Sequence, residues 1–275
     1  MKYIIILGDG MADEPIASIG NKTPLQAAET PHIDKLARMG RCGMLDTIPA
    51  GFAPGSEIAN LSVLGYDLSQ VYEGRGVLEA ASMGVEIADD EIAMRCNLIC
   101  IENDIIKSHS AGHISNEEAE ELIDFLQEKL GDQSVSFYSG VSYRHLLKLK
   151  NGNKHLKCTP PHDVPGTPFT SVLIQALTPE AEPTAALLNA LILKSQALLE
   201  NHPVNIKRAS QGKEKANSIW PWSPGNKPQM KKMTDIYPFK SGSVISAVDL
   251  IKGIGVYAGL KNIDVEGATG LYTTN

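Results

Sequence analysis

The sequence contains little cysteine, no long basic run and no long apolar run near its start. Its four cysteines among 275 residues include no C-x-x-C pair, which argues against a disulfide scaffold and favours reduced, packed thiols. The formal net charge is -7 with no cluster of Lys or Arg to offset it, so we expect no nucleic-acid or membrane partner. The apolar run at residues 3–7 is too short for a signal peptide or a membrane span. We therefore expect a soluble, cytoplasmic protein.

The residues that are present follow the pattern of an α/β protein. Hydrophobic residues make up 43% of the chain and charged residues 21%, which is ordinary globular composition. The run at 3–7 is continuously apolar and is followed by Gly8-Asp9-Gly10, which is the pattern expected of a strand buried on both faces of a parallel sheet. Residues 44–48 predict the next strand. Between them, Thr30-Pro31 predicts a helix start. Asp9 then lies at the sheet edge where α/β proteins bind ligands, which makes it a candidate metal ligand or catalytic group.

From about residue 76 the pattern indicates a second α/β or α+β unit. A helix is predicted between its cap at Ser115 and Gly131, with a second one at 184–200. Another helix is predicted at 244–260, and a strand at 263–265. The remaining strand candidates are 92–101, 105–106, 135–138 and 143–149.

Asp9 and Ser56 form the most informative pair of candidate functional residues. Ser56 follows a loop rich in Pro and Gly and precedes helical spacing, so it is expected at a helix N-terminus. A serine hydroxyl is a weak nucleophile that needs a base or a metal, and a helix N-terminus favours both its alkoxide and an incoming phosphate. The alternative is structural: Asp9 caps a turn and Ser56 caps a helix.

Several segments resemble the cofactor-independent phosphoglycerate mutases of the alkaline phosphatase superfamily. The segment IIILGDGMAD is similar to the first metal-ligand strand of that family, and PGSEIANLSVLGYD is similar to its nucleophile segment. The first helices of many phosphatases and sulfatases of the superfamily are similar to TPLQAAETPHIDKLARMG. The archaeal-type branch of the mutases is matched by YEGRGVLEAASMG, HSAGHISNEEAEEL and VISAVDLIKGIGVYAGL.

The resemblance implies a reaction and a metal site. In this family a phosphoryl group moves from the substrate to a serine and returns to a different hydroxyl, so that 3- and 2-phosphoglycerate interconvert in glycolysis without added 2,3-bisphosphoglycerate. Carried over by position, Ser56 becomes the phosphorylated, metal-bound residue and Asp9 a metal ligand. The implied cofactors are two divalent ions, Mn, Mg or Zn. The implied partner is a small phosphorylated acid, and a homo-oligomer is left open.

The resemblance also implies a substrate-binding unit at 76–230, inserted into a phosphatase-like, parallel-sheet core at 1–75 and 231–275. Arg75, His109, His113, Arg144 and His162 stand where this branch has substrate-facing groups. Arginine suits carboxylates and phosphates, and histidine can relay a proton. A capping role remains the alternative for His113, and a turn for His162 with its neighbouring aspartate.

The chain departs from the family in having no histidine after His202, although the two-metal site needs later histidines and aspartates. We therefore expect it to be the N-terminal two thirds of a longer enzyme. Two alternatives remain: a homoserine kinase-like phosphotransferase of the same branch, and a non-catalytic phosphometabolite-binding fragment. The basic residues Lys207, Arg208, Lys213 and Lys215 are interpreted as part of a solvated loop, with attraction of an anionic substrate as the alternative, and Trp220 and Trp222 as packing residues.

Overall fold

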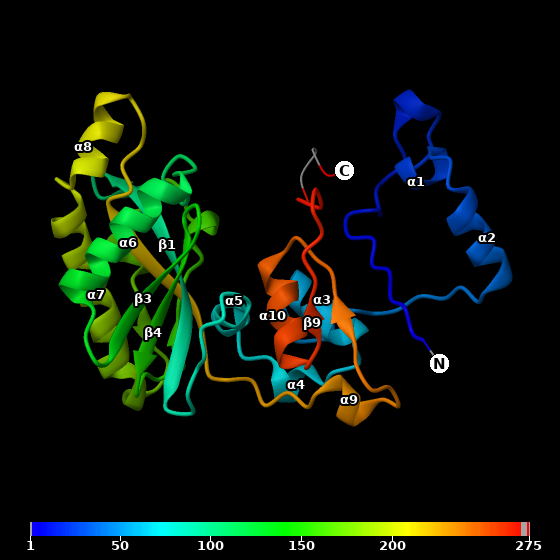
Figure 1. The fold of residues 1–275 in the computed structure, drawn as a ribbon. Coiled ribbons are helices and arrows are strands. Elements are labelled where there is room, and N and C mark those ends of the chain that lie inside the picture. Colours follow the sequence, from blue (N-terminus) through cyan, green and yellow to red (C-terminus); the bar gives the residue numbers. More distant parts are fainter. Residues whose placement is uncertain (1, 271–273, 275) are drawn as a thin grey trace. The chain divides into compact units, whose positions relative to one another are not determined.

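The structure is a computed structural model that describes residues 2–270 and residue 274. The chain divides into two compact units, residues 1–50 and 51–275, and each is described by itself (Figure 1). Within the described residues no helix is both long and apolar enough to cross a bilayer.

The first unit consists of short helices joined by extended chain. Its helices are η1 (Ala17–Ile19), α1 (Pro24–Ala27) and α2 (Pro31–Met39). Helix α1 begins at a capping box, in which the Thr23 side chain accepts a hydrogen bond from the Gln26 backbone and the Gln26 side chain accepts one from the Thr23 backbone. Helix α2 confirms the start predicted at Thr30-Pro31.

The strands predicted at 3–7 and 44–48 are wrong for the described residues. Neither segment pairs with a strand, and Ile4, Ile6 and Met44 are largely exposed. A strand needs a neighbour to accept and donate its backbone hydrogen bonds, and none of the described chain takes that place. An apolar run alone therefore did not determine this part of the fold.

The second unit begins with a helical layer made from two distant parts of the chain. Helices α3 and α5 pack against α10, and α3 also contacts α4. At Gly253 of α10 the approach is close, because a Cβ there would lie 1.9 Å from the carbonyl oxygen of Leu78 in α5. The elements of this layer are α3 (Ser56–Val63), α4 (Leu68–Val71), α5 (Arg75–Ser82), α9 (Met233–Ile236), β8 (Ser243–Val244), α10 (Asp249–Tyr257) and β9 (Lys261–Asn262).

A five-stranded antiparallel sheet forms the centre of the second unit. Strand β1 lies at its middle and pairs with β2, β4 and β7, while β3 pairs with β4. The prediction of a parallel main sheet is therefore wrong for the described residues, whose one parallel pair is the short β8–β9 contact. The strands of the main sheet are β1 (Glu91–Glu102), β2 (Ile105–Ser108), β3 (Val135–Val141), β4 (Arg144–Lys150) and β7 (Ser218–Gly225).

Strand β7 was not predicted, because Pro221 and Pro224 interrupt it. Proline lacks a backbone donor and is tolerated only where no ladder bond is needed. Strand β7 is an edge strand that pairs with β1 alone, which satisfies this condition. It places Trp222 opposite Arg95.

Apolar and polar side chains alternate along residues 94–98 of β1, so that the two kinds lie on opposite faces of the sheet. Met94, Cys96 and Leu98 join the apolar core. Arg95 and Asn97 are buried polar residues, and Arg95 pairs with Glu79 of α5. One face of β1 is therefore apolar, and the other carries the polar pair Arg95 and Asn97, with Arg95 reaching Glu79 of α5.

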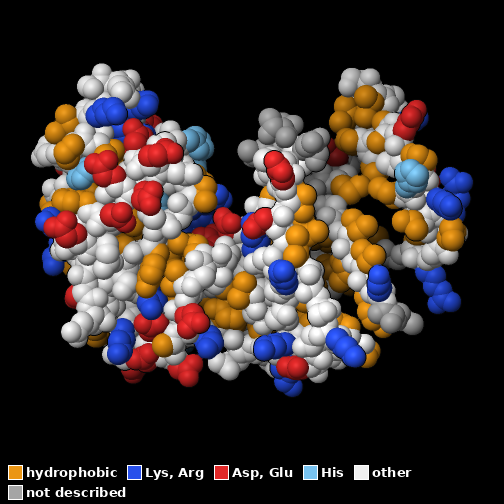
Figure 2. Space-filling model, in the orientation of Figure 1, with side chains coloured by type: hydrophobic (Ala, Val, Ile, Leu, Met, Phe, Trp, Pro, Cys, Tyr) orange, Lys and Arg blue, Asp and Glu red, His pale blue; other side chains and the backbone are white. Residues whose placement is uncertain are grey.

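The apolar face is covered by α6 (Asn116–Leu130) and α7 (Glu182–Leu199), which lie on the same side of the sheet (Figure 1). Helix α6 begins where predicted, with Ser115 accepting a hydrogen bond from the Glu118 backbone. Acidic side chains predominate over this part of the surface on the face shown in Figure 2, with fewer basic ones among them. The remaining elements are β5 (Leu156–Lys157), η2 (Pro161–Asp163), η3 (Phe169–Val172), β6 (Gln175–Ala176), η4 (Pro179–Ala181) and α8 (Pro203–Ser210).

The sheet buries His145 of β4, and this has a consequence for acid stability. Burial lowers the pKa of His145 to about 3, and the Gly140 N–H donates to its Nδ1 at 3.1 Å. An unfolded chain binds a proton on this ring below about pH 6.5 while the folded chain does not. Folding stability is therefore lost as the pH falls from about 6.5 towards 3, by about 1.4 kcal/mol per pH unit from this residue.

The variant His145→Gln should remove much of this acid dependence, because glutamine does not titrate and can still accept a hydrogen bond from Gly140. The loss of unfolding free energy between pH 7 and pH 4.5, measured in urea, should be smaller than in the wild type by about 2.5 kcal/mol. The exposed His155 provides the control His155→Gln, which should behave as the wild type. An unchanged pH dependence in His145→Gln would contradict this assignment.

Candidate functional site

Ser56 is the first residue of α3, as predicted, and its side chain is exposed. Its backbone carbonyl accepts a hydrogen bond from the Asn60 side chain at 2.8 Å. Gly55 precedes it, and a Cβ on this glycine would lie 2.8 Å from a carboxylate oxygen of Glu57. The hydroxyl therefore stands at a helix N-terminus with a buried carboxylate beside its backbone.

Glu57 is a functional candidate that the sequence analysis missed. It is 4% exposed, and its Oε1 accepts hydrogen bonds from Arg75 Nε at 2.8 Å and from the Tyr72 hydroxyl at 3.4 Å. Its Oε2 is also buried and has no partner in the described chain. Burial and the nearby charge of Glu57 raise the pKa of Tyr72 to about 12, so this hydroxyl stays protonated. The acidic residue after Ser56 was visible in the motif but had been given no role.

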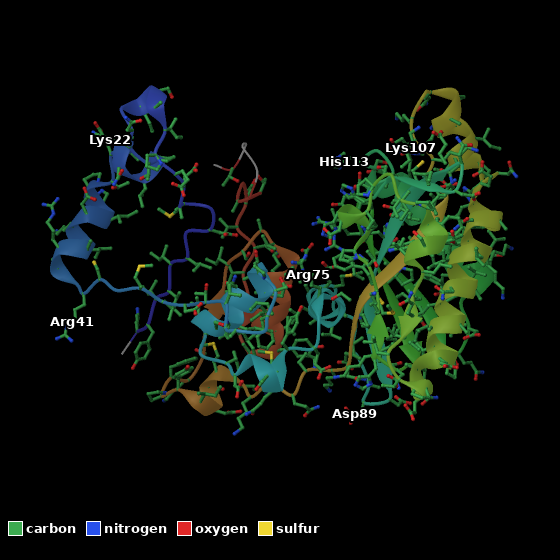
Figure 3. The ribbon with its side chains drawn as sticks, turned by 180° about the vertical axis from the view of Figure 1, so that it is seen from behind. Lys22, Arg41, Arg75, Asp89, Lys107 and His113 are labelled. Carbon is green, nitrogen blue, oxygen red and sulfur yellow. The ribbon has the colours of Figure 1, made fainter. Side chains whose placement is uncertain are left out.

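Arg75 begins α5 and lies between the helical layer and the sheet (Figure 3). Its Nε is occupied by Glu57, its backbone N–H donates to Ser223 Oγ at 2.9 Å, and its guanidinium carbon lies 5.9 Å from the centre of the Trp222 ring. The two terminal nitrogens make no hydrogen bond to any residue that the structure describes. Arg75 is thus held by one nitrogen and keeps two donors for a carboxylate or phosphate.

Trp222 connects Arg75 to the polar face of β1. Its Nε1 donates to Asn97 Oδ1 at 3.0 Å, and the Arg95 guanidinium carbon lies 5.1 Å from its ring centre. Its ring is also 5.4 Å from that of His162, in an edge-to-face arrangement. The residue was predicted to pack, and it does, since it is 5% exposed, but it also contacts three of the site's cationic or titratable groups.

The three predicted histidines lie in one neighbourhood with Tyr143. The His109 ring lies 6.2 Å from that of His162 and 5.7 Å from that of Tyr143, and the His113 ring lies 6.1 Å from Tyr143. Partial burial and the proximity of His162, His113 and Arg95 lower the pKa of His109. A neutral imidazole at this position can accept or relay a proton near neutral pH.

Arg144 lies at the start of β4, with its guanidinium carbon 6.0 Å from the Tyr143 ring centre. It belongs to no ion pair among residues 2–270. Arg95 differs, because its Nη1 pairs with Glu79 at 3.0 Å. Burial raises the pKa of Glu79, although the charges of Arg95 and Arg144 oppose the shift. The structure thus brings Arg75, Arg144 and the three histidines around a shared polar face.

Arg95, Asn97 and Glu79 were missed by the sequence analysis. The signal that could have identified them is the alternation of polar and apolar residues within a strand that is otherwise apolar, MRCNL at 94–98. Two polar side chains on one face of a buried strand need partners. Asn97 finds three, because it accepts from Arg95 Nε at 3.3 Å and from Trp222, and it donates to the His109 carbonyl at 3.2 Å.

Asp9 belongs to the first unit, in a turn with Gly10, and its side chain is exposed. Its predicted convergence with Ser56 stays a prediction. No three His, Cys, Asp or Glu side chains gather as a metal site in the part of the chain that the structure describes. The described residues alone therefore do not fit the expected two-metal centre.

The chain is similar to proteins of one known family. A family model described as 2,3-bisphosphoglycerate-independent phosphoglycerate mutase matches residues 37–205. A mutase of this name from Methanosarcina acetivorans is 51% identical over 276 residues, which cover 100% of this chain and 68% of the relative. A probable mutase of the same kind from Geobacter sulfurreducens is 48% identical over 279 residues, with the same coverage.

Two solved structures are similar to the chain. A Pyrococcus horikoshii protein matches with a TM-score of 0.75 and 31% identity over 97% of this chain and 62% of its own. A cofactor-independent phosphoglycerate mutase from Thermoplasma acidophilum matches with a TM-score of 0.62 and 28% identity, over 94% of this chain and 68% of its own. The curated relatives and solved structures are thus longer than the segment they share with it. The chain belongs to the 2,3-bisphosphoglycerate-independent phosphoglycerate mutases, a family of isomerases, as its motifs had indicated.

Proposed function

We propose that the full-length protein interconverts 3- and 2-phosphoglycerate in glycolysis through a phosphoserine at Ser56. The observation that carries this proposal is the position of Ser56 at the start of α3. The next residue, Glu57, forms an ion pair with Arg75 and so holds this arginine near Ser56. A nucleophile and an arginine with free donors are thereby joined by one buried carboxylate. The 51% identity with a mutase over the whole chain supports the same reaction.

The proposed reaction has two symmetrical halves. The Ser56 hydroxyl loses its proton as its oxygen attacks phosphorus, the bond from phosphorus to the substrate oxygen breaks, and that oxygen takes up a proton. The phosphoserine is then attacked by the other hydroxyl of glycerate, which loses its proton, and the serine oxygen leaves and regains a proton. The N–H groups at the start of α3 favour the negative charge carried by the serine oxygen and the phosphate.

The polar face around Trp222 is proposed to hold the glycerate and phosphate oxygens. Arg75 and Arg144 have donors that no described residue uses, and a planar guanidinium can bind a carboxylate or phosphate through two parallel hydrogen bonds. His109, His113 and His162 lie close enough together for one to carry a proton to or from a substrate hydroxyl.

We further propose that Asp9 and Ser56 contribute to a site for two divalent ions, Mn, Mg or Zn. The described chain holds no complete set of ligands, so the proposal requires ligands from elsewhere in the protein. Bound there, such ions would lower the pKa of the serine hydroxyl and neutralise phosphate charge. The proposal includes a cytoplasmic location, because glycolytic intermediates are dissolved cytoplasmic metabolites.

The predicted domain boundaries remain part of the proposal, with a phosphatase-like core at 1–75 and 231–275 and an inserted unit at 76–230. Contacts within the second unit support them. The Tyr66 hydroxyl donates to the Lys231 carbonyl at 2.7 Å, and the Tyr237 hydroxyl donates to the Leu64 carbonyl at 3.1 Å. Two segments that are distant in sequence are thus bonded to each other, as a split core requires.

A direct comparison of activities tests the proposed function. Purified full-length protein with divalent metal should convert 3-phosphoglycerate to 2-phosphoglycerate, and should do so without added 2,3-bisphosphoglycerate. The same preparation should not transfer phosphate from ATP to homoserine. Homoserine phosphorylation without mutase turnover would reject the proposal in favour of the kinase, and phosphoglycerate binding without turnover would favour a non-catalytic role.

A further inference from the structure

Arg208 is buried, although the sequence placed it in a solvated basic loop. Its side chain is 3% exposed, and all three of its nitrogens are used. Nη2 donates to the Ala111 carbonyl at 2.6 Å, Nε donates to the Glu214 carbonyl at 2.8 Å, and Nη1 pairs with Glu118. One guanidinium from α8 therefore joins the loop after β2, the first turn of α6 and the segment that leads into β7.

The loop that Arg208 holds has an unusual backbone. Ala111, Gly112 and His113 all adopt the left-handed conformation, with φ of 47°, 63° and 53°. This conformation is unfavourable for residues other than glycine, and three in succession persist only where surrounding contacts determine them. The loop makes two such contacts itself, because the Gly112 N–H donates to Ser108 Oγ at 3.2 Å and the His113 N–H donates to Ser110 Oγ at 3.4 Å.

The same loop carries two of the candidate substrate-facing histidines. His109 and His113 flank Ala111 at two residues on either side, and both rings meet Tyr143 edge to face. Asn97 fixes one end of the loop through the His109 carbonyl, and Ser142 Oγ fixes the other through the Ile114 carbonyl at 2.7 Å. The middle is fixed by Arg208, since the Ala111 carbonyl accepts its Nη2.

We propose that Arg208 is a positioning residue that holds the left-handed loop at 111–113, so that His109 and His113 converge on Tyr143 to receive the substrate. It acts through the Ala111 carbonyl and does not itself touch the substrate. The role of these histidines rests on the proposed function. Arg208 suits this task because its rigid fork can serve three acceptors at once, whereas lysine presents one nitrogen.

The variant Arg208→Lys in the full-length protein tests this proposal, because it keeps the positive charge beside Glu118 and loses the bond to the loop. We expect KM for 3-phosphoglycerate to rise about tenfold, with a smaller change in kcat, since the histidines lose their shared orientation. Lys207→Met is the matched control, because it removes an exposed charge from the same helix without a contact to the loop. It should leave KM unchanged.

A second readout follows the histidines directly. In the wild type the pKa of His109 is lowered by burial and by His162, His113 and Arg95, while Glu214 opposes the shift. Release of the loop in Arg208→Lys should raise that pKa, as measured by NMR titration of the imidazole, and should shift the His113 resonances. The resonances of His155, which bonds Asn153 outside the loop, should stay in place.

Glu118→Gln serves if Arg208→Lys fails to fold, because glutamine keeps an acceptor for Arg208 and weakens only the charge. It should shift KM and the His109 pKa in the same direction by less. A purely structural role would lower the thermal stability of both variants but leave KM and the histidine resonances unchanged, and that result would overturn the proposal. If His109→Ala and His113→Ala leave KM unchanged, the proposed substrate site is wrong, while the NMR readout still decides the role of Arg208.

Discussion

Replacing Ser56 with alanine in the full-length protein is expected to lower mutase turnover by about 10⁴-fold or more. Alanine has no oxygen to accept the phosphoryl group, so the reaction loses its intermediate. The fold should be unaffected, since the side chain is exposed and does not cap α3. The interconversion of 3- and 2-phosphoglycerate, followed by phosphorus NMR, measures the effect.

Ser210→Ala is a suitable control, because Ser210 is an exposed serine near the end of α8 whose hydroxyl bonds only a helix carbonyl within the described chain. It should retain wild-type turnover. Mass spectrometry of the wild type quenched during turnover should find phosphate on Ser56 and not on Ser210. Normal turnover in Ser56→Ala, or phosphate on another residue, would contradict the phosphoserine mechanism.

The variant Arg75→Lys is expected to raise KM for 3-phosphoglycerate by about 10- to 100-fold, with little change in folding stability. Lysine can keep the ion pair with the buried Glu57 but leaves no planar fork for the substrate. The loss of one or two charge-assisted hydrogen bonds is worth about 1.5–3 kcal/mol, which corresponds to this range. Steady-state kinetics measures KM, and thermal unfolding measures stability.

Arg38→Lys makes the same chemical change at an exposed arginine of α2 and should leave both quantities unchanged. An unchanged KM in Arg75→Lys would show that the free guanidinium nitrogens do not bind substrate. A large loss of stability at unchanged KM would instead give Arg75 the role of a partner for Glu57 alone.

Local patterns in the sequence predicted much of the second unit correctly. Helix α6 begins at Ser115 because a serine side chain can accept a hydrogen bond from the free backbone N–H of Glu118, and this depends only on residues three apart. Strand β1 was recognised by its apolar run, and α3 by the loop residues before Ser56. Strand β7 escaped prediction because its prolines are acceptable only at an edge, and edge position is a property of the whole sheet.

The predicted site residues were identified mainly through the motifs, while their supporting residues were not. In the sequence Asn97 looks like any other strand residue. Its role depends on Trp222 of β7, which lies opposite Arg95 and donates a hydrogen bond to Asn97. Arg208 lies among exposed basic residues in the sequence, so its burial is invisible there. Neither position has a local signal, because the contact that gives it meaning is made by a distant segment.

The sequence by itself determined the family, the starts of α2 and α6 and the position of Ser56 at a helix N-terminus, because motifs and caps depend on residues only a few positions apart. The helix predicted at 244–260 begins only at Asp249. Tertiary structure alone decided the antiparallel order of the main sheet and two long-range contacts. These are the ion pair of Glu57 with Arg75, which are 18 residues apart in sequence, and the hydrogen bond from Arg208 to the Ala111 carbonyl, which are 97 residues apart. The path of the whole chain places these groups together, and burial then makes each hydrogen bond costly to lose.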